Sequence, residues 1–503
     1  MKRPAAAIIL LVLALLHGRP ARSEPPAAAK AEPPAAKSFT TRHEVVVGKA
    51  KLAYRVMAEE TYLRDREGKP EASIFSTAYV LDRGGDAAAR PIAFLFNGGP
   101  GSSSVWLHLG AFGPLRVDIP SDPVNPGAPP YRLAPNPQTL LPATDLVFVD
   151  PVGTGYSRAL GEKKDVDYWG VDEDAAATAA FVREYLTRHK RWASPKYIVG
   201  ESYGTIRASL LVRDLQLGPL NNVSINGVVL VSAALDVRVF QSGVPGNDLA
   251  YVTSLPTYAA TAYYHKALDA QPADLEAFLQ KARRFASTEY VTALFQGDPM
   301  PEDRARQIAQ TMHDFTGLST EFLRRSRFRV SAERFRKELL RARGLTVGAH
   351  DTRFVGKDPD DAGEAVEIDP FIRSISGPFV TAMNSYLTDE LGVEMDRPYE
   401  VFQMAANRAW KRPEGESWVD GYLYTLPFLA QAAAVNSGFR VFVASGYHDL
   451  TTTFFGAEHQ IQSSGIDPKR VTNRNYEGGH MMYLDAASRA RLSADVAAFI
   501  QGR

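Results

Sequence analysis

Short runs of apolar residues recur along the chain, separated by longer stretches of mixed polarity. Early in the chain, apolar positions alternate with polar ones, which favours antiparallel strands. These strands are expected at 44–47, 50–56 and 72–80. Later runs are apolar at almost every position, as in parallel strands buried on both faces. They are expected at 91–96, 145–150, 196–199, 227–232 and 440–444. With helical stretches between several of them, the pattern predicts an α/β fold with a mostly parallel, doubly wound central sheet.

The interval between the last two of these strands is much longer than one strand connection requires. Roughly residues 237–412 are rich in helical stretches, for example 272–288, 301–316 and 331–343. We expect this segment to be a helical lid insertion, because such lids exclude water from a site and shape its pocket. The core of the α/β domain is then divided into 39–236 and 413–503.

One five-residue segment carries the strongest chemical signal. Residues 200–204 read Gly-Glu-Ser-Tyr-Gly and stand between a predicted strand and a predicted helix. This is the context of a nucleophile elbow, a strained turn that exposes a serine hydroxyl above the sheet. Ser202 is therefore the candidate nucleophile.

The partners of such a serine follow it in a fixed order. In the α/β-hydrolase fold the order along the chain is Ser, then Asp or Glu, then His. Asp449 follows the strand predicted at 440–444, and His480 lies in a glycine loop before the C-terminal helix. The competing candidates are Asp467 and Asp485 for the acid, and His448 and His459 for the base. Upstream, the loop 97–101 (Asn-Gly-Gly-Pro-Gly) follows a buried strand, where a backbone N–H can point at a developing oxyanion.

Composition excludes several other classes of function. Lys plus Arg equals Asp plus Glu, 57 each, so nothing favours nucleic acid as a partner. The chain of 503 residues has no cysteine and hence no disulfides. No His or Cys cluster has the spacing of a zinc site, and no phosphate-binding loop occurs. We expect neither a metal nor a cofactor.

The N-terminal region has the pattern of an export signal. A short basic start, an apolar stretch and small residues before Glu24 predict a signal peptide at 1–23, and a Pro/Ala-rich linker follows at 24–38. The apolar run is too short to span a bilayer comfortably. We expect a periplasmic or secreted protein without stable membrane insertion after cleavage.

Taken together, these motifs resemble the serine carboxypeptidase family, in its bacterial branch. The matching segments are 97–103, 113–114, 146–157, 200–204, 446–449 and 478–481. The resemblance runs from about residue 90 to the C-terminus and thins across the expected lid. The chain departs from the family where a Glu usually precedes the Gly-Pro at 113–114, since 109–112 has no carboxylate, and where Tyr483 replaces a frequent proline.

The resemblance implies a role for each residue of the site. Ser202 would be the nucleophile, His480 the general base and then acid, and Asp449 the group that orients the imidazole. The backbone N–H groups of Gly99 and Tyr203 would form the oxyanion hole. Recognition of a free C-terminal carboxylate would fall to Asn97, Gly98 and Glu201, the last as a protonated donor. Arg207 is either half of a structural ion pair or a replacement positive contact.

These observations predict an exported hydrolase that removes C-terminal residues from peptides through an acyl-enzyme. Peptides with a free C-terminus would be its partners. The alternatives are an acyltransferase or esterase on the same fold, an aminopeptidase of the proline iminopeptidase type, and a binding protein that has kept the fold without the activity. The sequence leaves the preferred side chains and the oligomeric state open.

Overall fold

The computed structural model describes residues 35–503 except 83–88, 126, 219, 221, 298 and 413–422. The expected signal peptide, most of the linker and the start of the second core segment therefore lie outside the described residues. Described regular structure begins with β1 at Ser38. No helix in the described part of the chain is both long and apolar enough to cross a membrane.

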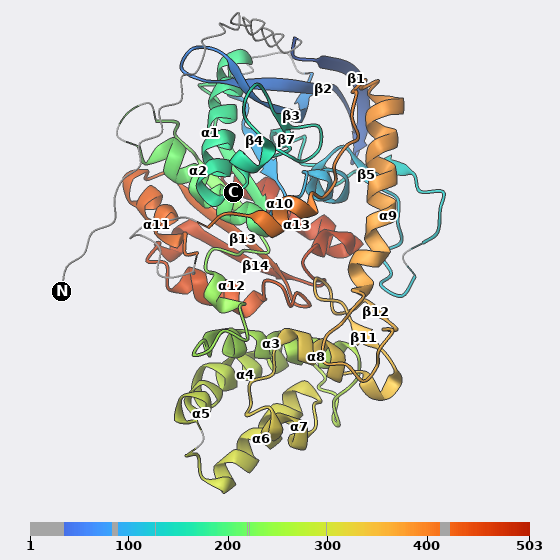
Figure 1. Cartoon of the computed structure of the whole chain (residues 1–503), viewed down its shortest axis with the longest axis vertical. Coiled ribbons are helices and arrows are strands. Elements are labelled where there is room, and N and C mark those ends of the chain that lie inside the picture. Colours follow the sequence, from blue (N-terminus) through green and yellow to red (C-terminus); the bar gives the residue numbers. More distant parts are fainter. Residues whose placement is uncertain are drawn as a thin grey trace, which may run out of the picture. The chain divides into compact units, whose positions relative to one another are not determined.

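The centre of the fold is a ten-stranded mixed sheet (Figure 1). Its order is β1-β2-β3-β7-β4-β9-β10-β13-β14, and β8 pairs with β3. The antiparallel edge consists of β1 (Ser38–Val47), β2 (Ala50–Arg64) and β3 (Pro70–Leu81), with β8 (Arg158–Ala159). The parallel part consists of β7 (Asp145–Val149), β4 (Ile92–Phe96), β9 (Lys196–Glu201), β10 (Gly227–Val231), β13 (Arg440–Gly446) and β14 (Val471–Tyr476). The predicted α/β architecture with a mostly parallel sheet is confirmed.

Helices cover both faces of the sheet because its inner strands are apolar on both sides. Along β4, for example, Ala93 and Leu95 belong to one core, whereas Ile92, Phe94 and Phe96 belong to the other. The second core is covered by α1 (Val171–Arg188), α2 (Tyr203–Gln216) and α11 (Leu426–Val435). The first is covered by α9 (Pro370–Ser385), α13 (Ala486–Gln501) and a π-helical turn at Leu107–Phe112. This alternation explains why the sequence shows unbroken apolar runs.

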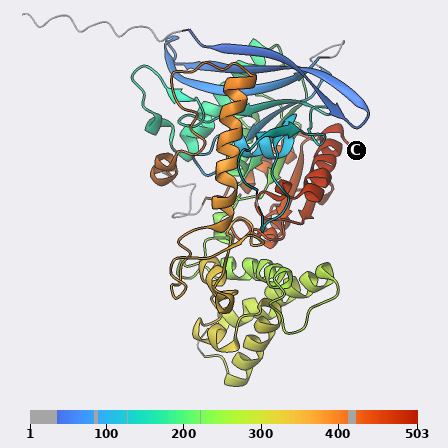
Figure 2. The ribbon, with the colours of Figure 1, turned by 90° about the vertical axis from the view of Figure 1, so that its right-hand side faces the viewer.

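Most of the remaining helices lie between β10 and β13 and form one group, seen at the bottom of Figures 1 and 2. They are α3 (Leu249–Tyr264), α4 (Leu275–Phe285), α5 (Val291–Gln296), α6 (Glu302–Thr316), α7 (Thr320–Arg325) and α8 (Ala332–Glu338). These helices share a separate apolar core, which Leu450 and Phe454 join from the β13 side. The group therefore packs against α12 (Phe454–Gln462), close to the loop that follows β13.

The other elements are short. They comprise β5 (Leu115–Val117), β6 (Leu133–Pro135), β11 (Thr346–Val347), β12 (Val355–Gly356) and α10 (Met404–Ala409). The single turns of helix are Asp165–Tyr168, Val237–Val239, Ala286–Tyr290, Arg341–Arg343, Tyr386–Glu390, Pro468–Arg470 and Met482–Leu484. The helix predicted at 331–343 ends earlier, because α8 stops at Glu338 and only a 3-10 turn follows.

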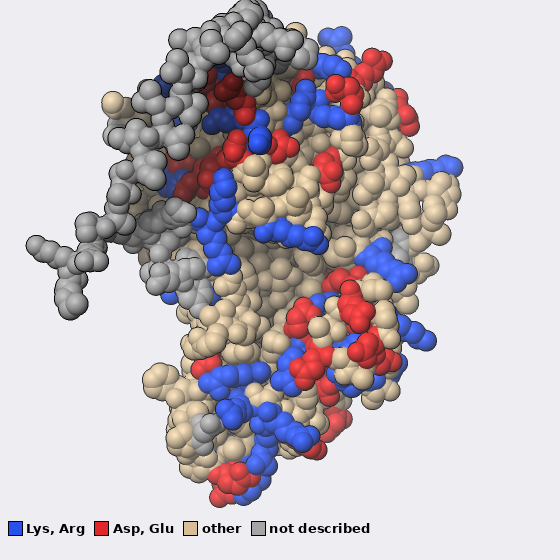
Figure 3. All heavy atoms as spheres, in the orientation of Figure 1, with Lys and Arg blue, Asp and Glu red and all other residues tan. Residues whose placement is uncertain are grey.

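The arginine-rich surface of the helical group is not a patch of one sign. Figure 3 shows Lys and Arg interspersed with Asp and Glu over this region. Arg324 pairs with Glu302 at 2.6 Å, and Arg325 pairs with Glu321 at 3.3 Å. The positive charge of these side chains is therefore largely compensated locally.

Candidate active site

The turn after β9 holds Ser202 in a strained conformation. Ser202 has φ = 59°, a region that non-glycine residues rarely adopt. A Cβ on Gly200 would lie 2.1 Å from the carbonyl oxygen of Gly204, and a Cβ on Gly204 would lie 2.7 Å from that of Phe96. Only glycines allow the strand, turn and helix to approach this closely, which explains the spacing of the motif.

Asp449 and His480 form a buried hydrogen bond. The His480 Nδ1 lies 2.8 Å from the Asp449 Oδ2, and the two side chains are 2% and 0% exposed. The same carboxylate accepts bonds from the backbone N–H groups of Thr451 and Thr452 and from the Thr452 hydroxyl. These bonds fix the position of the carboxyl group, which can therefore hold the imidazole in one orientation.

The environment of His480 favours its charged form. Burial lowers the pKa of His480, but the charge of Asp449 and the hydrogen bond to it, with a smaller contribution from Glu201, raise this pKa above its ordinary value of 6.5. With Nδ1 bonded to Asp449, the other ring nitrogen, Nε2, is the one free to exchange a proton with a nucleophile. Among the described side chains, the Ser202 hydroxyl makes no hydrogen bond to this ring. Such catalytic contacts often close only on substrate binding.

Ser232 joins the turn at 200–204 (the nucleophile turn) to the loop at 477–480 (the histidine loop). It was not identified in the sequence analysis. It follows β10, the strand between β9 and β13, and also has a positive φ, 53°. Its hydroxyl donates to the His480 carbonyl at 2.7 Å, while the Ser202 N–H donates to the carbonyl of its neighbour Val231 at 3.0 Å. Ser202 and His480 are thus both tied to the end of β10.

The competing acids and histidines occupy other positions in the structure. Asp467 caps the 3-10 turn at 468–470, and Asp485 caps α13. The His448 ring bonds to Glu477 at 2.8 Å, and His459 lies within α12. The structure brings Asp449 and His480 together and gives these four residues structural positions elsewhere.

The glycine loop after β4 lies directly against the nucleophile turn. A Cβ on Gly98 would be 2.5 Å from the Tyr203 backbone nitrogen, so the two backbones are nearly in contact. Tyr203 is the first residue of α2, and its N–H therefore has no partner within the helix. Arg207 forms a buried ion pair with Asp174 at 2.7 Å and donates to the Asn97 carbonyl at 2.8 Å. The ion pair of Arg207 with Asp174 is therefore structural, and Arg207 also supports the glycine loop through Asn97.

Glu201 is buried directly before Ser202 in the chain, and its hydrogen-bond partner is a phenol. The Tyr483 hydroxyl donates to Glu201 Oε2 at 2.7 Å. The ring of Tyr483 fills the space next to Gly110, where a Cβ would lie 2.7 Å from the ring edge. Tyr483 thus packs against segment 109–112, which lacks the carboxylate that is usual in the family. The missing carboxylate and the unusual Tyr483 were noted separately in the sequence analysis, without one being related to the other.

Burial raises the pKa of the Glu201 carboxyl from 4.5 to about 7. The charge of His480 and hydrogen bonds from Tyr483 and Asn97 lower this pKa, while the charge of Asp449 raises it. The Asn97 side-chain oxygen accepts from the Leu107 N–H at 3.0 Å, but its amide nitrogen is buried without a well-formed hydrogen bond. The site therefore holds an acid that is neutral below about pH 7, with the Asn97 amide beside it.

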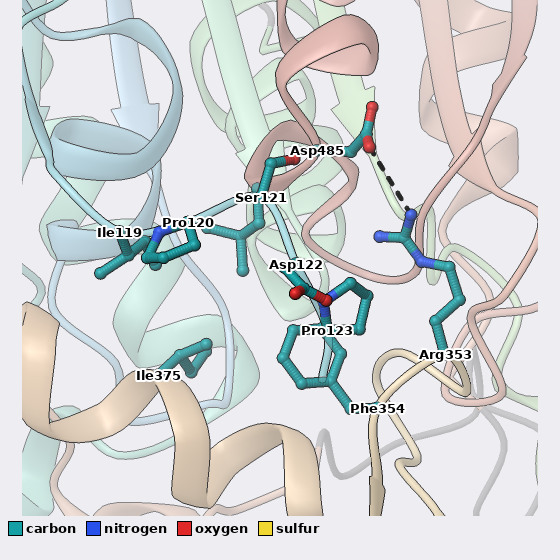
Figure 4. Close-up of a pocket in the computed structure, with 10 residues that line it drawn as sticks. Ile119, Pro120, Ser121, Asp122, Pro123, Arg353, Phe354, Ile375 and Asp485 are labelled. Carbon is teal, nitrogen blue, oxygen red and sulfur yellow. Dashed lines mark ion pairs between the residues drawn. The ribbon is translucent and has the colours of Figure 1, made fainter. Parts of the chain in front are cut away.

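A small pocket lies near this region but outside the site (Figure 4). It is lined by Ile119–Pro123, Arg353, Phe354, Ile375, Leu484 and Asp485. Arg353 reaches toward Asp485 across it, with the charged atoms 3.7 Å apart. No residue expected to act in catalysis or in substrate binding is among its lining residues.

Comparisons with known proteins support the fold and the resemblance to the serine carboxypeptidase family. A sequence model of the family described as serine carboxypeptidase matches residues 67–289. This match includes the loop at 97–101 and the nucleophile turn, and ends before Asp449 and His480. Residues 67–289 of this chain are thus similar to the serine carboxypeptidases.

Individual relatives are distant. Serine carboxypeptidase-like 8 of Arabidopsis thaliana is 30% identical over 142 residues, which are 28% of this chain and 31% of the relative. Serine carboxypeptidase-like 20 of the same plant is 27% identical over 148 residues, 29% of this chain and 28% of the relative. The matches thus span about a third of the length of these curated relatives.

The fold extends further than the sequence similarity. The prohormone-processing carboxypeptidase Kex1(Δ)p of Saccharomyces cerevisiae superposes with a TM-score of 0.53 at 15% identity. The superposition covers 89% of this chain and 91% of that protein. The predicted α/β-hydrolase fold and the resemblance to the serine carboxypeptidase family are both confirmed.

The raised pKa of Glu201 predicts a pH-dependent cost to folding. An unfolded Glu ionises near 4.5, whereas the buried one ionises near 7. The folded protein therefore loses stability as the pH rises between these two values, and the loss is constant above them. Glu201→Gln removes the charge, so it should raise the free energy of unfolding by roughly 3 kcal/mol at pH 9 and change it little at pH 4.

Denaturant unfolding at both pH values measures this difference. Glu321→Gln is the matched control, because among the described residues the exposed Glu321 pairs with the equally exposed Arg325, and it should change stability little at either pH. Equal effects of Glu201→Gln at pH 4 and pH 9 would contradict the raised pKa.

Proposed function

We propose that this chain is a serine carboxypeptidase that releases C-terminal residues from peptides through an acyl-enzyme. The observation that carries the proposal is the buried Glu201, which lies directly before the strained serine and accepts a hydrogen bond from a neutral phenol. A plain esterase or an aminopeptidase has no need of a protonated acid at this position. A carboxypeptidase needs a donor there for the terminal carboxylate.

In the proposed reaction, the Ser202 Oγ attacks the carbonyl carbon of the last peptide bond. His480 Nε2 takes the serine proton and gives it to the leaving amine, which departs as the free C-terminal amino acid. Water then attacks the acyl-enzyme ester, and His480 takes a proton from it and returns one to the Ser202 oxygen. The carboxylate of Asp449 stabilises the imidazolium formed in both steps.

Two backbone N–H groups would stabilise the oxyanion. Tyr203 N–H is unpaired within its helix, and the Gly99 N–H belongs to the loop that lies against it. Donors fixed in the backbone need no rearrangement when the negative charge develops. Segment 237–412 is proposed as the lid, because its helices pack against the region that follows β13 and carries Asp449.

The terminal carboxylate would bind to Glu201, Asn97 and the Gly98 N–H. The Asn97 amide nitrogen is a buried donor without a good partner of its own, and Glu201 donates when protonated. Tyr483 holds one Glu201 oxygen, which leaves the other for the substrate. In this proposal a phenol takes the place that a second acid has in the family.

If Ser202, Asp449 and His480 form a catalytic triad, replacement of Ser202 should abolish the covalent reaction with a serine-directed probe. Wild-type protein should react with a fluorophosphonate probe and hydrolyse an activated ester. Ser202→Ala should abolish labelling, and either Ser202→Ala or His480→Ala should cut turnover by about four orders of magnitude or more, since triad members act as a unit. Ser287→Ala is the control, because Ser287 is exposed and lies in the separate helical group, and it should leave turnover unchanged. Near-normal turnover in a folded Ser202→Ala or His480→Ala protein would disprove the assignment.

The carboxylate site predicts a pH effect that is specific to peptide acids. The measured quantity is the ratio of kcat/KM for a blocked dipeptide acid to kcat/KM for the ester of the same dipeptide. Because His480 acts on both substrates, its titration affects both values equally and does not change the ratio. This ratio should fall as the pH rises through about 7, because Glu201 ionises, stops donating and repels the substrate. Glu201→Ala should lower the ratio at acidic pH about tenfold to a hundredfold, the cost of one hydrogen bond to a charged group.

Two further variants distinguish the role of Glu201 as a hydrogen-bond donor from the effect of its negative charge. Glu201→Gln remains a donor at all pH values, so its ratio should not change with pH. Tyr483→Phe removes a hydrogen bond that lowers the pKa of Glu201, so the fall in the ratio should move to higher pH. A wild-type ratio that is flat with pH, or equal cleavage of amide-blocked peptides, would refute carboxypeptidase activity and leave an esterase or acyltransferase. Transfer of the acyl group to an added alcohol, measured by product analysis, would identify the latter.

We also propose that the protein is exported, on the basis of the basic, apolar and small-residue regions that precede Glu24. N-terminal sequencing of the protein from its native host should find a start near Glu24. An intact Met1 in the cytoplasmic fraction would contradict export.

A further inference from the structure

A loop from the segment between β10 and β13 lies directly on the histidine loop. It connects β11 to β12 and spans residues 348–354. The His480 N–H donates to the His350 carbonyl at 2.5 Å, and the Gly479 N–H donates to the Asp351 carboxylate at 3.0 Å. A Cβ on Gly479 would lie 2.1 Å from the His350 carbonyl oxygen, so no side chain fits between the two loops.

The side chain of His350 also meets that of His480. The two imidazole rings stand at 89° to each other with their centroids 5.0 Å apart, an edge-to-face contact. The ring of His350 lies parallel to that of Phe371 in α9, with centroids 5.9 Å apart. Its Nδ1 is buried and has no hydrogen-bond partner among the described residues. The ring is thus held by packing, between α9 and His480.

The rest of the loop is anchored on both sides. Arg353 pairs with Asp351 at 2.8 Å and lies 3.7 Å from Asp485, as Figure 4 shows for the second pair. The Thr352 N–H donates to the carbonyl of His448, and the Leu450 N–H donates to that of Ala349. The loop therefore bonds to the backbone on either side of Asp449 as well as to His480.

We propose that His350 is a positioning residue for His480, acting through ring packing and through the backbone bond to the His480 N–H. The proposal rests on the triad function proposed above. The bond to Asp449 fixes only one ring nitrogen of His480, and the ring can still tilt about that bond. The edge contact with His350 opposes this tilt and excludes water from one side of the imidazole.

The charges around His350 are compatible with this role. The groups that act on it are His480 and Arg336, which lower its pKa, and Asp449 and Asp369, which raise it. Burial is the largest influence, and the pKa of His350 is lowered to about 4. His350 is therefore neutral at the pH at which His480 exchanges protons, and adds no positive charge beside it.

Replacement of the ring tests the proposal. The substrate is a small activated ester without a carboxylate, so that the readout does not depend on Glu201. His350→Ala should lower kcat by about threefold to tenfold, the value of one aromatic pair contact, with KM changed by less than about twofold. The acid limb of the pH profile should move to higher pH, because water admitted beside His480 relieves the burial that lowers its pKa.

Two variants serve as controls. His350→Phe keeps the ring edge and should restore most of kcat and the wild-type acid limb. Thr352→Ala removes the hydroxyl contact to Thr261 in α3 from the same loop but does not touch His480, and should behave as the wild type. If His350→Ala does not fold, as judged by its thermal unfolding, His350→Leu fills the space without an aromatic edge and should show the same loss.

Three results would overturn the proposal: an unchanged kcat in His350→Ala, a change confined to KM, or a His350→Phe protein as impaired as His350→Ala. The second result would make His350 a substrate contact. Inactive wild-type protein that also fails to react with the fluorophosphonate probe would instead refute the triad function.

Discussion

The buried hydrogen bond between Asp449 and His480 is the constraint on which the rest of the site depends. A fully buried carboxylate is costly unless its oxygens are satisfied, and here the turn after β13 supplies two N–H groups and one hydroxyl. The imidazole supplies the remaining donor. The loop that carries His480 is held by two hydrogen bonds, one from the Ser232 hydroxyl to the His480 carbonyl and one from the His480 N–H to the His350 carbonyl. Elements far apart in the sequence are thus fixed by the requirement to satisfy the hydrogen bonds of one buried carboxyl group.

A second buried carboxyl, that of Glu201, has a different environment from that of Asp449. Its neighbours are a phenol, an amide and the imidazole, and burial favours the neutral acid up to about pH 7. The site therefore contains one carboxyl that accepts four hydrogen bonds and a second that burial keeps protonated at acidic pH. In the proposed function, the first carboxyl orients the general base and the second donates to the terminal carboxylate of the substrate.

Much of the fold followed from the sequence, because parallel strands buried on both faces leave unbroken apolar runs and because the order of the motifs matched one fold. The strand ends carrying Ser202, Asp449 and His480 were predictable for the same reason. The contact between Tyr483 and Glu201 was not, since it joins residues 282 positions apart through the packing of Tyr483 beside Gly110. His350 gave no signal, because it lies in a short loop with no motif. The roles of the site residues remain predictions.

The measurement that tests the central claim most directly is digestion of a peptide library, with the products read by mass spectrometry. The account predicts stepwise loss of single residues from the C-terminal end of peptides with a free carboxyl group, and no products from the Ser202→Ala protein. Loss of residues from the N-terminal end, or cleavage of peptides irrespective of a free C-terminus, would contradict it.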